Sequence, residues 1–248
     1  MKPIKRVLGC VRKADQDFSL IKDNDRIAVG ISGGKDSSVL LYCLYLYKMF
    51  SKKNYEFCGI YIDLGFGQEN MHQIVEYFAK LGVTVHIVPS QISDILDINR
   101  SADGRIECSL CSKLRKGALV NAAKELGCNK VAFGHHSDDA VETLFLNMIH
   151  GGRIATFKPN MLLERSGVYL IRPLVYAYEK DIARMCRELE IPVSKNKCPN
   201  EGYTDRTSMK FILEDLYKKY PEARNNFQLM LRNQEQLDIF KPKKEDAE

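Results

Sequence analysis

The six residues Ser32-Gly-Gly-Lys-Asp-Ser37 have the composition of a phosphate-binding loop. Two adjacent glycines let the backbone fold tightly and turn its N–H groups toward an anion. Lys35 adds a full positive charge, and the hydroxyl groups of Ser32 and Ser37 add hydrogen-bond donors. The run differs from the Walker loop, because Asp36 follows the lysine where that motif requires Ser or Thr.

A second polar run, Gly134-His-His-Ser-Asp-Asp139, also carries groups that could do chemistry. Two adjacent carboxylates are costly to crowd together unless a cation lies near them. A divalent cation such as Mg²⁺ would meet that need.

Eight cysteines are present, and three of them stand out. Cys108 and Cys111 form a C-x-x-C at the start of a predicted helix, which could be a redox pair, half of a metal site, or a chance spacing. Cys198 lies in a loop between two predicted helices. The others fall in or beside helix and strand patterns, where a cysteine packs as a small hydrophobe; they are Cys10, Cys43, Cys58, Cys128 and Cys186.

The elements around these groups alternate between strands and helices. Strands are predicted at 26–31, 56–62, 84–88 and 130–133. Helices are predicted over 4–11, 38–50, 69–81, 111–126, 179–190, 208–219 and 222–240, another follows residue 139, and 151–170 reads as a loop or hairpin. This alternation predicts an α/β fold with a parallel sheet. We interpret 89–107 as irregular and the tail, 241–248, as frayed.

In such a sheet, ligands bind beyond the carboxyl ends of the strands. Ser32–Ser37 follows the first strand, Asp63 ends the second, and Gly134–Asp139 follows the fourth. All three are therefore expected at one edge of the sheet, which predicts a single site there.

Composition narrows the classes of protein that remain. The chain has 248 residues, of which 45% are hydrophobic and 28% charged, so a disordered protein is excluded. Its net charge of +5 is compatible with a nucleic-acid partner. The longest apolar stretch, Val39–Tyr47, is too short to span a bilayer. We therefore expect no membrane association and a cytoplasmic protein with reduced thiols.

The motifs resemble a known family. S-G-G-K-D-S is similar to the signature of the PP-loop ATP pyrophosphatases, which cleave ATP between the α and β phosphates and adenylate a substrate. The segments C-S-L-C-S-K-L-R-K-G, G-H-H-S-D-D-A-V-E-T-L-F-L-N-M-I-H-G-G and I-R-P-L-V-Y-A-Y-E-K-D-I resemble the TtcA family, the tRNA 2-thiocytidine synthetases. The resemblance runs from about residue 20 to 220.

The resemblance implies a PP-loop fold with helical additions at both ends. It divides the chain into an N-terminal helix (1–22), the PP-loop domain with the C-x-x-C (23–190), and a C-terminal helical segment with the third cysteine (191–248).

It also implies a reaction, in which the enzyme adenylates and then thiolates C2 of cytidine 32 in the tRNA anticodon loop. Pyrophosphate leaves into the loop, and sulfide then displaces AMP. The implied catalytic residues are Asp139, Lys35 and Arg115, the last standing where related thiouridine enzymes carry a lysine. The implied ATP and Mg²⁺ site comprises Ser32, Gly33, Gly34, Lys35, Asp36, Ser37, Asp63, Gly134 and His135.

The resemblance further implies a [4Fe–4S] cluster on Cys108, Cys111 and Cys198. Three thiolates leave one iron without a protein ligand, and that open position could hold hydrosulfide. Some members have another cysteine three residues after the last ligand, where this chain has Glu201. Implied partners are tRNA, a sulfur donor (sulfide or a cysteine desulfurase) and a second copy of the chain in a homodimer.

Basic residues near the cysteines and after residue 150 interleave with tyrosines, as on an RNA-binding surface. The candidate tRNA contacts are Lys113, Lys116, Arg153, Lys158 and Arg172. Two other functions stay open: a PP-loop enzyme that acts on another tRNA base, such as uridine, and a nucleotide-binding module whose cysteines hold structural zinc.

Overall fold

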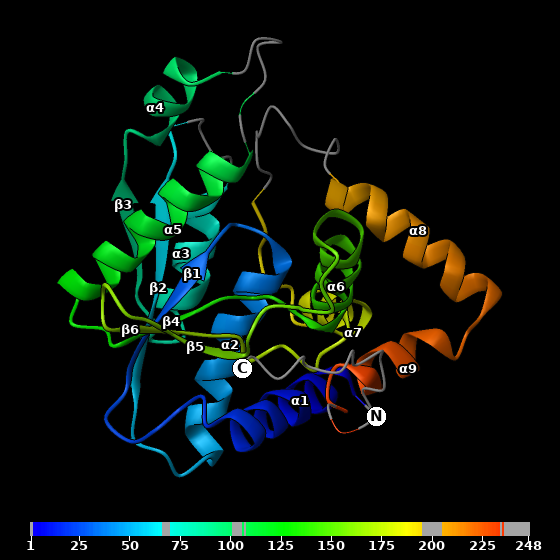
Figure 1. Ribbon diagram of the computed structural model, residues 1–248. Coiled ribbons are helices and arrows are strands. Elements are labelled where there is room, and N and C mark those ends of the chain that lie inside the picture. The colour runs from blue at the N-terminus through cyan, green and yellow to red at the C-terminus, as the bar shows by residue number, and fades with distance from the viewer. Residues whose placement is uncertain are drawn as a thin grey trace, which may run out of the picture.

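The computed structural model describes residues 2–65, 70–100, 106, 108–194, 205–233 and 235. Within these residues lies a six-stranded sheet in the order β3-β2-β1-β4-β6-β5, with helices on both of its faces (Figure 1). Neighbouring strands are parallel except β5 and β6, which pair antiparallel. The α/β fold with a mostly parallel sheet is therefore confirmed.

The bounds of the elements are as follows. The strands are β1 (Arg26–Ile31), β2 (Glu56–Asp63), β3 (Val85–Pro89), β4 (Lys130–Ala132), β5 (Asn160–Leu163) and β6 (Val168–Ile171). The helices are α1 (Pro3–Phe18), α2 (Lys35–Phe50), α3 (Met71–Ala79), α4 (Ile92–Ile98), α5 (Cys108–Glu125), α6 (Ser137–Gly151), α7 (Glu179–Glu188), α8 (Asp205–Lys219) and α9 (Ala223–Met230).

Strand β1 lies at the centre and determines where a ligand can bind. Its neighbours, β2 and β4, lead away from it in opposite directions across the sheet, so the order of strands reverses at β1. A reversal of this kind is the usual place of the ligand site in open α/β sheets, beyond the carboxyl ends of the strands.

Alternating side chains of β1 build two apolar cores. Ile27, Val29 and Ile31 pack with α1, α2, α3 and α7, whereas Ala28 faces the core formed with α4 and α5. A third, smaller cluster joins Val141 of α6 to residues of α8 and α9. The C-terminal helices are thus held against α6 beside the sheet (Figure 1).

Several predicted elements were wrong in detail. Residues 89–107 are not wholly irregular, because α4 forms there and buries Ile92 and Leu96, one turn apart. Helix α2 begins at Lys35 and so includes the loop lysine. Helix α9 ends at Met230, well before residue 240. The hairpin reading of 151–170 is confirmed by β5 and β6.

The five cysteines that were expected to pack as small hydrophobic residues lie in or against the apolar cores. Cys43, Cys128 and Cys186 are buried, and Cys10 and Cys58 pack against the two main cores. None of the helices in the described part of the chain is long and apolar enough to cross a membrane.

Candidate active site

A cavity of about 580 Å³ lies at the carboxyl ends of β1 and β4, beneath the start of α5. It brings together three motifs that are far apart in the sequence. Its lining includes Ser32, Asp36 and Ser37 from the first loop, Gly134, His135 and Asp139 from the second, and Cys108, Cys111, Arg115, Lys116 and Arg172. Two of the three segments expected at this edge thus meet in one cavity with the C-x-x-C, whereas Asp63 is not among the residues that line it.

The loop between β1 and α2 is held in shape by its own serines. Ser32 N donates to Ser37 Oγ at 3.1 Å, the two hydroxyl oxygens lie 3.1 Å apart, and Ser37 Oγ donates to the carbonyl of Gly34 at 3.1 Å. Gly33 has a φ of +87°, which glycine adopts without strain. These hydrogen bonds hold the loop in a closed shape, and the N-terminus of α2 faces the same space.

Gly134 lets the two loops pack backbone to backbone. A Cβ atom at this position would lie 2.8 Å from the carbonyl carbon of Asp36 and 3.0 Å from Ser37 N. These are main-chain atoms that cannot rotate away, so a side chain here would separate the loop after β4 from the phosphate loop.

Gly134→Ala is therefore expected to weaken ATP binding strongly and to cost about 1–3 kcal/mol of stability, as overpacking does. Isothermal titration with ATP and a thermal melt measure the two effects. Gly152→Ala is the control. Apart from the glycine and its chain neighbours, no atom in the described part of the chain lies within 4 Å of the point where its Cβ would stand, although its φ of +55° adds strain. It should lower the melting temperature and leave ATP affinity unchanged. Equal ATP affinity in both variants would contradict the proposed role of Gly134.

The two adjacent carboxylates of the second loop have different surroundings. Asp139 Oδ2 accepts from His136 N at 2.9 Å, in a capping box that begins α6, and Asp139 also lines the cavity. Asp138 instead accepts from Glu179 N at 2.8 Å and from Arg224 of α9. Asp139 is therefore the carboxylate placed to act in the cavity, and Asp138 joins α6 to α7 and α9.

His135 is held neutral with a defined tautomer. The pKa of His135 is lowered to about 4, mainly by burial; Asp139 opposes this shift and Arg172 adds to it. Arg172 Nε donates to His135 Nδ1 at 3.2 Å, so the ring proton lies on Nε2. His135 can thus donate one hydrogen bond from Nε2 but cannot serve as a cation near neutral pH.

Arg172 and Lys116 belong to the cavity rather than to the open surface. Arg172 is buried, and its guanidinium stacks 4.8 Å from the ring centre of Phe157. Lys116 is half-buried, and burial and Arg172 lower its pKa. Contact with tRNA at these positions would require the target base to enter the cavity. The other candidates, Lys113, Arg153 and Lys158, are exposed.

Asp36 offers an oxygen that fits a cation. Its Oδ1 atom is buried and has no hydrogen-bond partner among the described residues. Burial raises the pKa of the Asp36 carboxyl, although His136 and Lys35 oppose this. A hard cation such as Mg²⁺ prefers such carboxylate oxygens. Asp36 therefore fits the nucleotide-bound metal better than Asp63, whose Oδ1 accepts from Gly65 N and caps a turn.

Cys108 and Cys111 occupy the first turn of α5 and both line the cavity. Their spacing of three residues places them on one face of the helix. Thiolates suit an iron–sulfur cluster, so this donor pair fits one. No group of three His, Cys, Asp or Glu side chains that could hold a metal occurs within the described ranges. Cys198 and Glu201 lie outside those ranges, so the third ligand stays a prediction.

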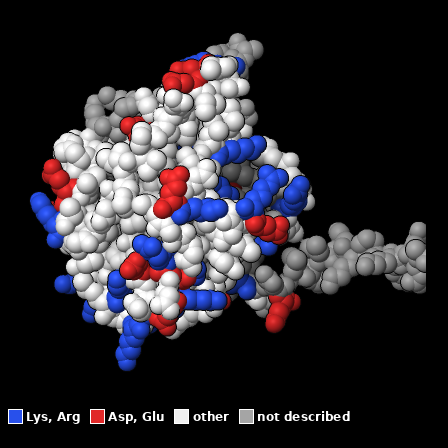
Figure 2. All heavy atoms as spheres, turned by 90° about the vertical axis from the view of Figure 1, so that its left-hand side faces the viewer, with Lys and Arg blue, Asp and Glu red and all other residues white. Residues whose placement is uncertain are grey.

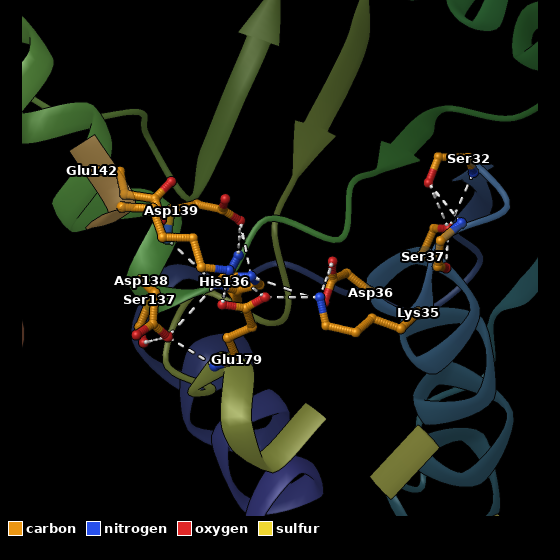
Figure 3. Close-up of polar contacts among 12 residues, drawn as sticks. Ser32, Lys35, Asp36, Ser37, His136, Ser137, Asp138, Asp139, Glu142 and Glu179 are labelled. Carbon is orange, nitrogen blue, oxygen red and sulfur yellow. Dashed lines mark hydrogen bonds and ion pairs between the residues drawn. The ribbon is translucent and has the colours of Figure 1, made fainter. Parts of the chain in front are cut away.

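Sequence reasoning missed three charged residues that surround the site. Glu179 at the start of α7 forms an ion pair with the motif residue Lys35 (Figure 3). Lys210 on α8 pairs with Glu179, and Arg224 on α9 pairs with the motif residue Asp138. Glu179 falls inside one of the motifs noted above, but its spacing gives no sign of its partner. Lys210 and Arg224 stand in no motif.

The comparisons agree on a family. The PP-loop domain family matches residues 8–208. The tRNA-cytidine(32) 2-sulfurtransferase of Geobacter sulfurreducens is 38% identical over 231 residues, covering 92% of this chain and 90% of the relative. The enzyme of the same name from Pelobacter propionicus is 36% identical over 231 residues, covering 92% and 86%.

A solved structure has the same fold. The U34-tRNA thiolase NcsA from Methanococcus maripaludis, determined with its [4Fe–4S] cluster, aligns with a TM-score of 0.73 and 25% identity over 95% of this chain and 80% of that one. On the family match and the identity to the two curated relatives, this chain belongs to the PP-loop family and, within it, to the tRNA-cytidine(32) 2-sulfurtransferases of the TtcA type.

Proposed function

We propose that this protein uses ATP to adenylate and thiolate C2 of cytidine 32 in the tRNA anticodon loop. One observation carries the proposal: the phosphate loop, Asp139 and both cysteines of the C-x-x-C line the same cavity. An enzyme that activates a base with ATP and then adds sulfur to the same carbon needs these groups within reach of one another.

In the first step, the phosphate loop and the N-terminus of α2 bind the triphosphate, with Mg²⁺ at Asp36. The C2 oxygen of the base attacks the α-phosphate, the bond between the α- and β-phosphates breaks, and pyrophosphate leaves into the loop. Arg115 and Arg172 supply positive charge in the cavity near the developing charge.

In the second step, hydrosulfide adds to C2 and AMP departs. Asp139 accepts the remaining sulfhydryl proton, so that the C2–S double bond forms and the base returns to neutrality. A [4Fe–4S] cluster bound by Cys108, Cys111 and Cys198 would supply an open iron site at which sulfur is held ready for transfer.

The charge of the surface suits a tRNA partner. Figure 2 shows Lys and Arg side chains gathered around a hollow near the upper right of that face. Such a surface attracts the phosphate backbone independently of sequence. Lys113, Arg153 and Lys158 are our candidates for these contacts. The sulfur donor, the cytoplasmic location and the homodimer stay predictions.

The target base is tested by nucleoside analysis of tRNA from a deletion strain. We expect 2-thiocytidine to disappear and to return when the wild-type gene, but not a Lys35→Ala copy, is restored. Loss of a 2-thiouridine with 2-thiocytidine intact would overturn the cytidine assignment. That alternative has support, because NcsA is a U34-tRNA thiolase.

The nature of the metal is tested by anaerobic purification. An iron–sulfur protein is brown with broad visible absorption, whereas a structural zinc site is colourless. A colourless protein that contains stoichiometric zinc, and that gains no absorption on reconstitution with iron and sulfide, would support the nucleotide-binding module instead.

A further inference from the structure

The lysine of the phosphate loop is directed away from the cavity. Lys35 Nζ contacts Glu179 Oε1 at 2.9 Å and Asp36 Oδ2 at 3.3 Å. Figure 3 shows its side chain extending from α2 toward Glu179, away from Ser32 and Ser37. Lys35 is not among the residues that line the cavity, although its neighbours Asp36 and Ser37 are. A carboxylate therefore holds the charge that the phosphates need.

Glu179 is itself shared between two lysines. Lys210 Nζ on α8 lies 2.9 Å from Glu179 Oε1 and 2.7 Å from Oε2, so it contacts both carboxylate oxygens. Glu179 stands at the start of α7, and its backbone N–H donates to Asp138. Its position is thus determined by α6 and α7, while its two counter-charges come from α2 and α8.

Both lysines stabilise the charge of this half-buried carboxylate. Burial alone would raise the pKa of Glu179, but hydrogen bonds from Lys210 and Lys35 hold it at about 2. A carboxylate that lost all its partners here would be costly to keep charged. Because Lys210 contacts both oxygens, Glu179 stays paired even if Lys35 leaves.

We propose that Glu179 and Lys210 are positioning residues that hold Lys35 outside the cavity before ATP binds and release it to the polyphosphate when ATP arrives. This rests on the proposed function, since it assumes that the loop binds the β- and γ-phosphates. Glu179 competes with the phosphates for Lys35. Lys210 keeps Glu179 paired when Lys35 moves to the phosphates, and so lowers the free-energy cost of that move. Helix α8 is thereby coupled electrostatically to nucleotide binding.

The two residues should have opposite effects on ATP affinity. Glu179→Gln removes the competing charge, so ATP should bind about three- to fivefold more tightly, the size expected for a half-exposed ion pair. Lys210→Met leaves Lys35 as the lysine partner of Glu179, so ATP should bind about three- to fivefold more weakly. Isothermal titration of the full-length, reconstituted protein with ATP and Mg²⁺ measures both changes.

Three controls distinguish the positioning role of Glu179 and Lys210 from an effect on the packing of α8 and from the electrostatic effect of any nearby charge. Arg206→Met removes a positive charge one turn away on α8, where Arg206 pairs with Glu142 at 3.6 Å, and should leave ATP affinity unchanged. AMP lacks the β- and γ-phosphates, so its affinity should be equal in all variants. In a Lys35→Met background, both effects should vanish, because residues that act through Lys35 are not additive with it.

The outcomes test separately the phosphate-loop role of Lys35 and the positioning role of Glu179 and Lys210. If Lys35→Met alone leaves ATP affinity unchanged, the phosphate-loop role in the proposed function is wrong. If Lys35→Met weakens binding, but Glu179→Gln and Lys210→Met shift affinity in the same direction or keep their effects in the Lys35→Met background, the positioning role is wrong and the phosphate loop stands.

Discussion

Replacing Cys108 or Cys111 with serine is expected to remove the iron–sulfur cluster and to reduce thiolation of tRNA below detection. Each change removes one of three proposed thiolate ligands, and serine is a poor ligand for such a cluster. Adenylation should continue, because the phosphate loop is held by hydrogen bonds among Ser32, Gly34 and Ser37 that these changes leave intact. Iron and sulfide content, visible absorption, and tRNA-dependent release of pyrophosphate measure these results.

Cys198→Ser should behave in the same way if it supplies the third ligand. The matched control is Cys128→Ser, a change of the same chemistry at a buried cysteine that packs in the core beneath α5. It should lower the melting temperature and keep the cluster. A Cys111→Ser protein with full iron content and normal thiolation would rule out the cluster assignment. Loss of pyrophosphate release together with the cluster would show instead that the change distorts the whole cavity.

The sequence was enough to predict that the loops lie at one edge of the sheet, because the alternation of strands and helices and the chemistry of each loop are visible in local segments. Gly-Gly after an apolar run predicts a phosphate loop, and parallel strands bring Ser32–Ser37 and Gly134–Asp139 to one edge. The preference for Asp139 over Asp138 came from the family resemblance. The surroundings that distinguish these carboxylates come from α7 and α9, which no local pattern predicts.

Three features could not be predicted because they depend on tertiary contacts. The partner of Lys35 is Glu179, which is 144 residues away. The burial of Arg172 depends on the stacking of Phe157 and the hydrogen bond to His135, so a basic residue that resembled a surface residue lies inside the cavity. Helix α4 forms in a polar segment because Ile92 and Leu96 bury a single apolar stripe. In each case the residue type is visible in the sequence, but its neighbour is supplied by the fold.

Asp139→Asn is expected to retain ATP binding within about twofold and to lower thiolation by about 10²–10⁴-fold, the range for loss of a general acid–base group. Asparagine keeps the size of the side chain and an oxygen that can accept from His136 N, so the capping box that begins α6 stays formed. What it loses is the charge that accepts a proton in the cavity. Titration with ATP and single-turnover formation of 2-thiocytidine measure the two effects.

Asp138→Asn makes the same change one residue earlier, at a carboxylate that contacts Arg224 and Glu179 N instead of lining the cavity. It should lower the melting temperature, because the ion pair to α9 is weakened, and keep thiolation within about tenfold of wild type, the effect of roughly one lost interaction. If Asp138→Asn abolished thiolation while Asp139→Asn left it near normal, the catalytic role would belong to Asp138. If neither change lowered thiolation, the sulfhydryl proton must pass to solvent or to another cavity group.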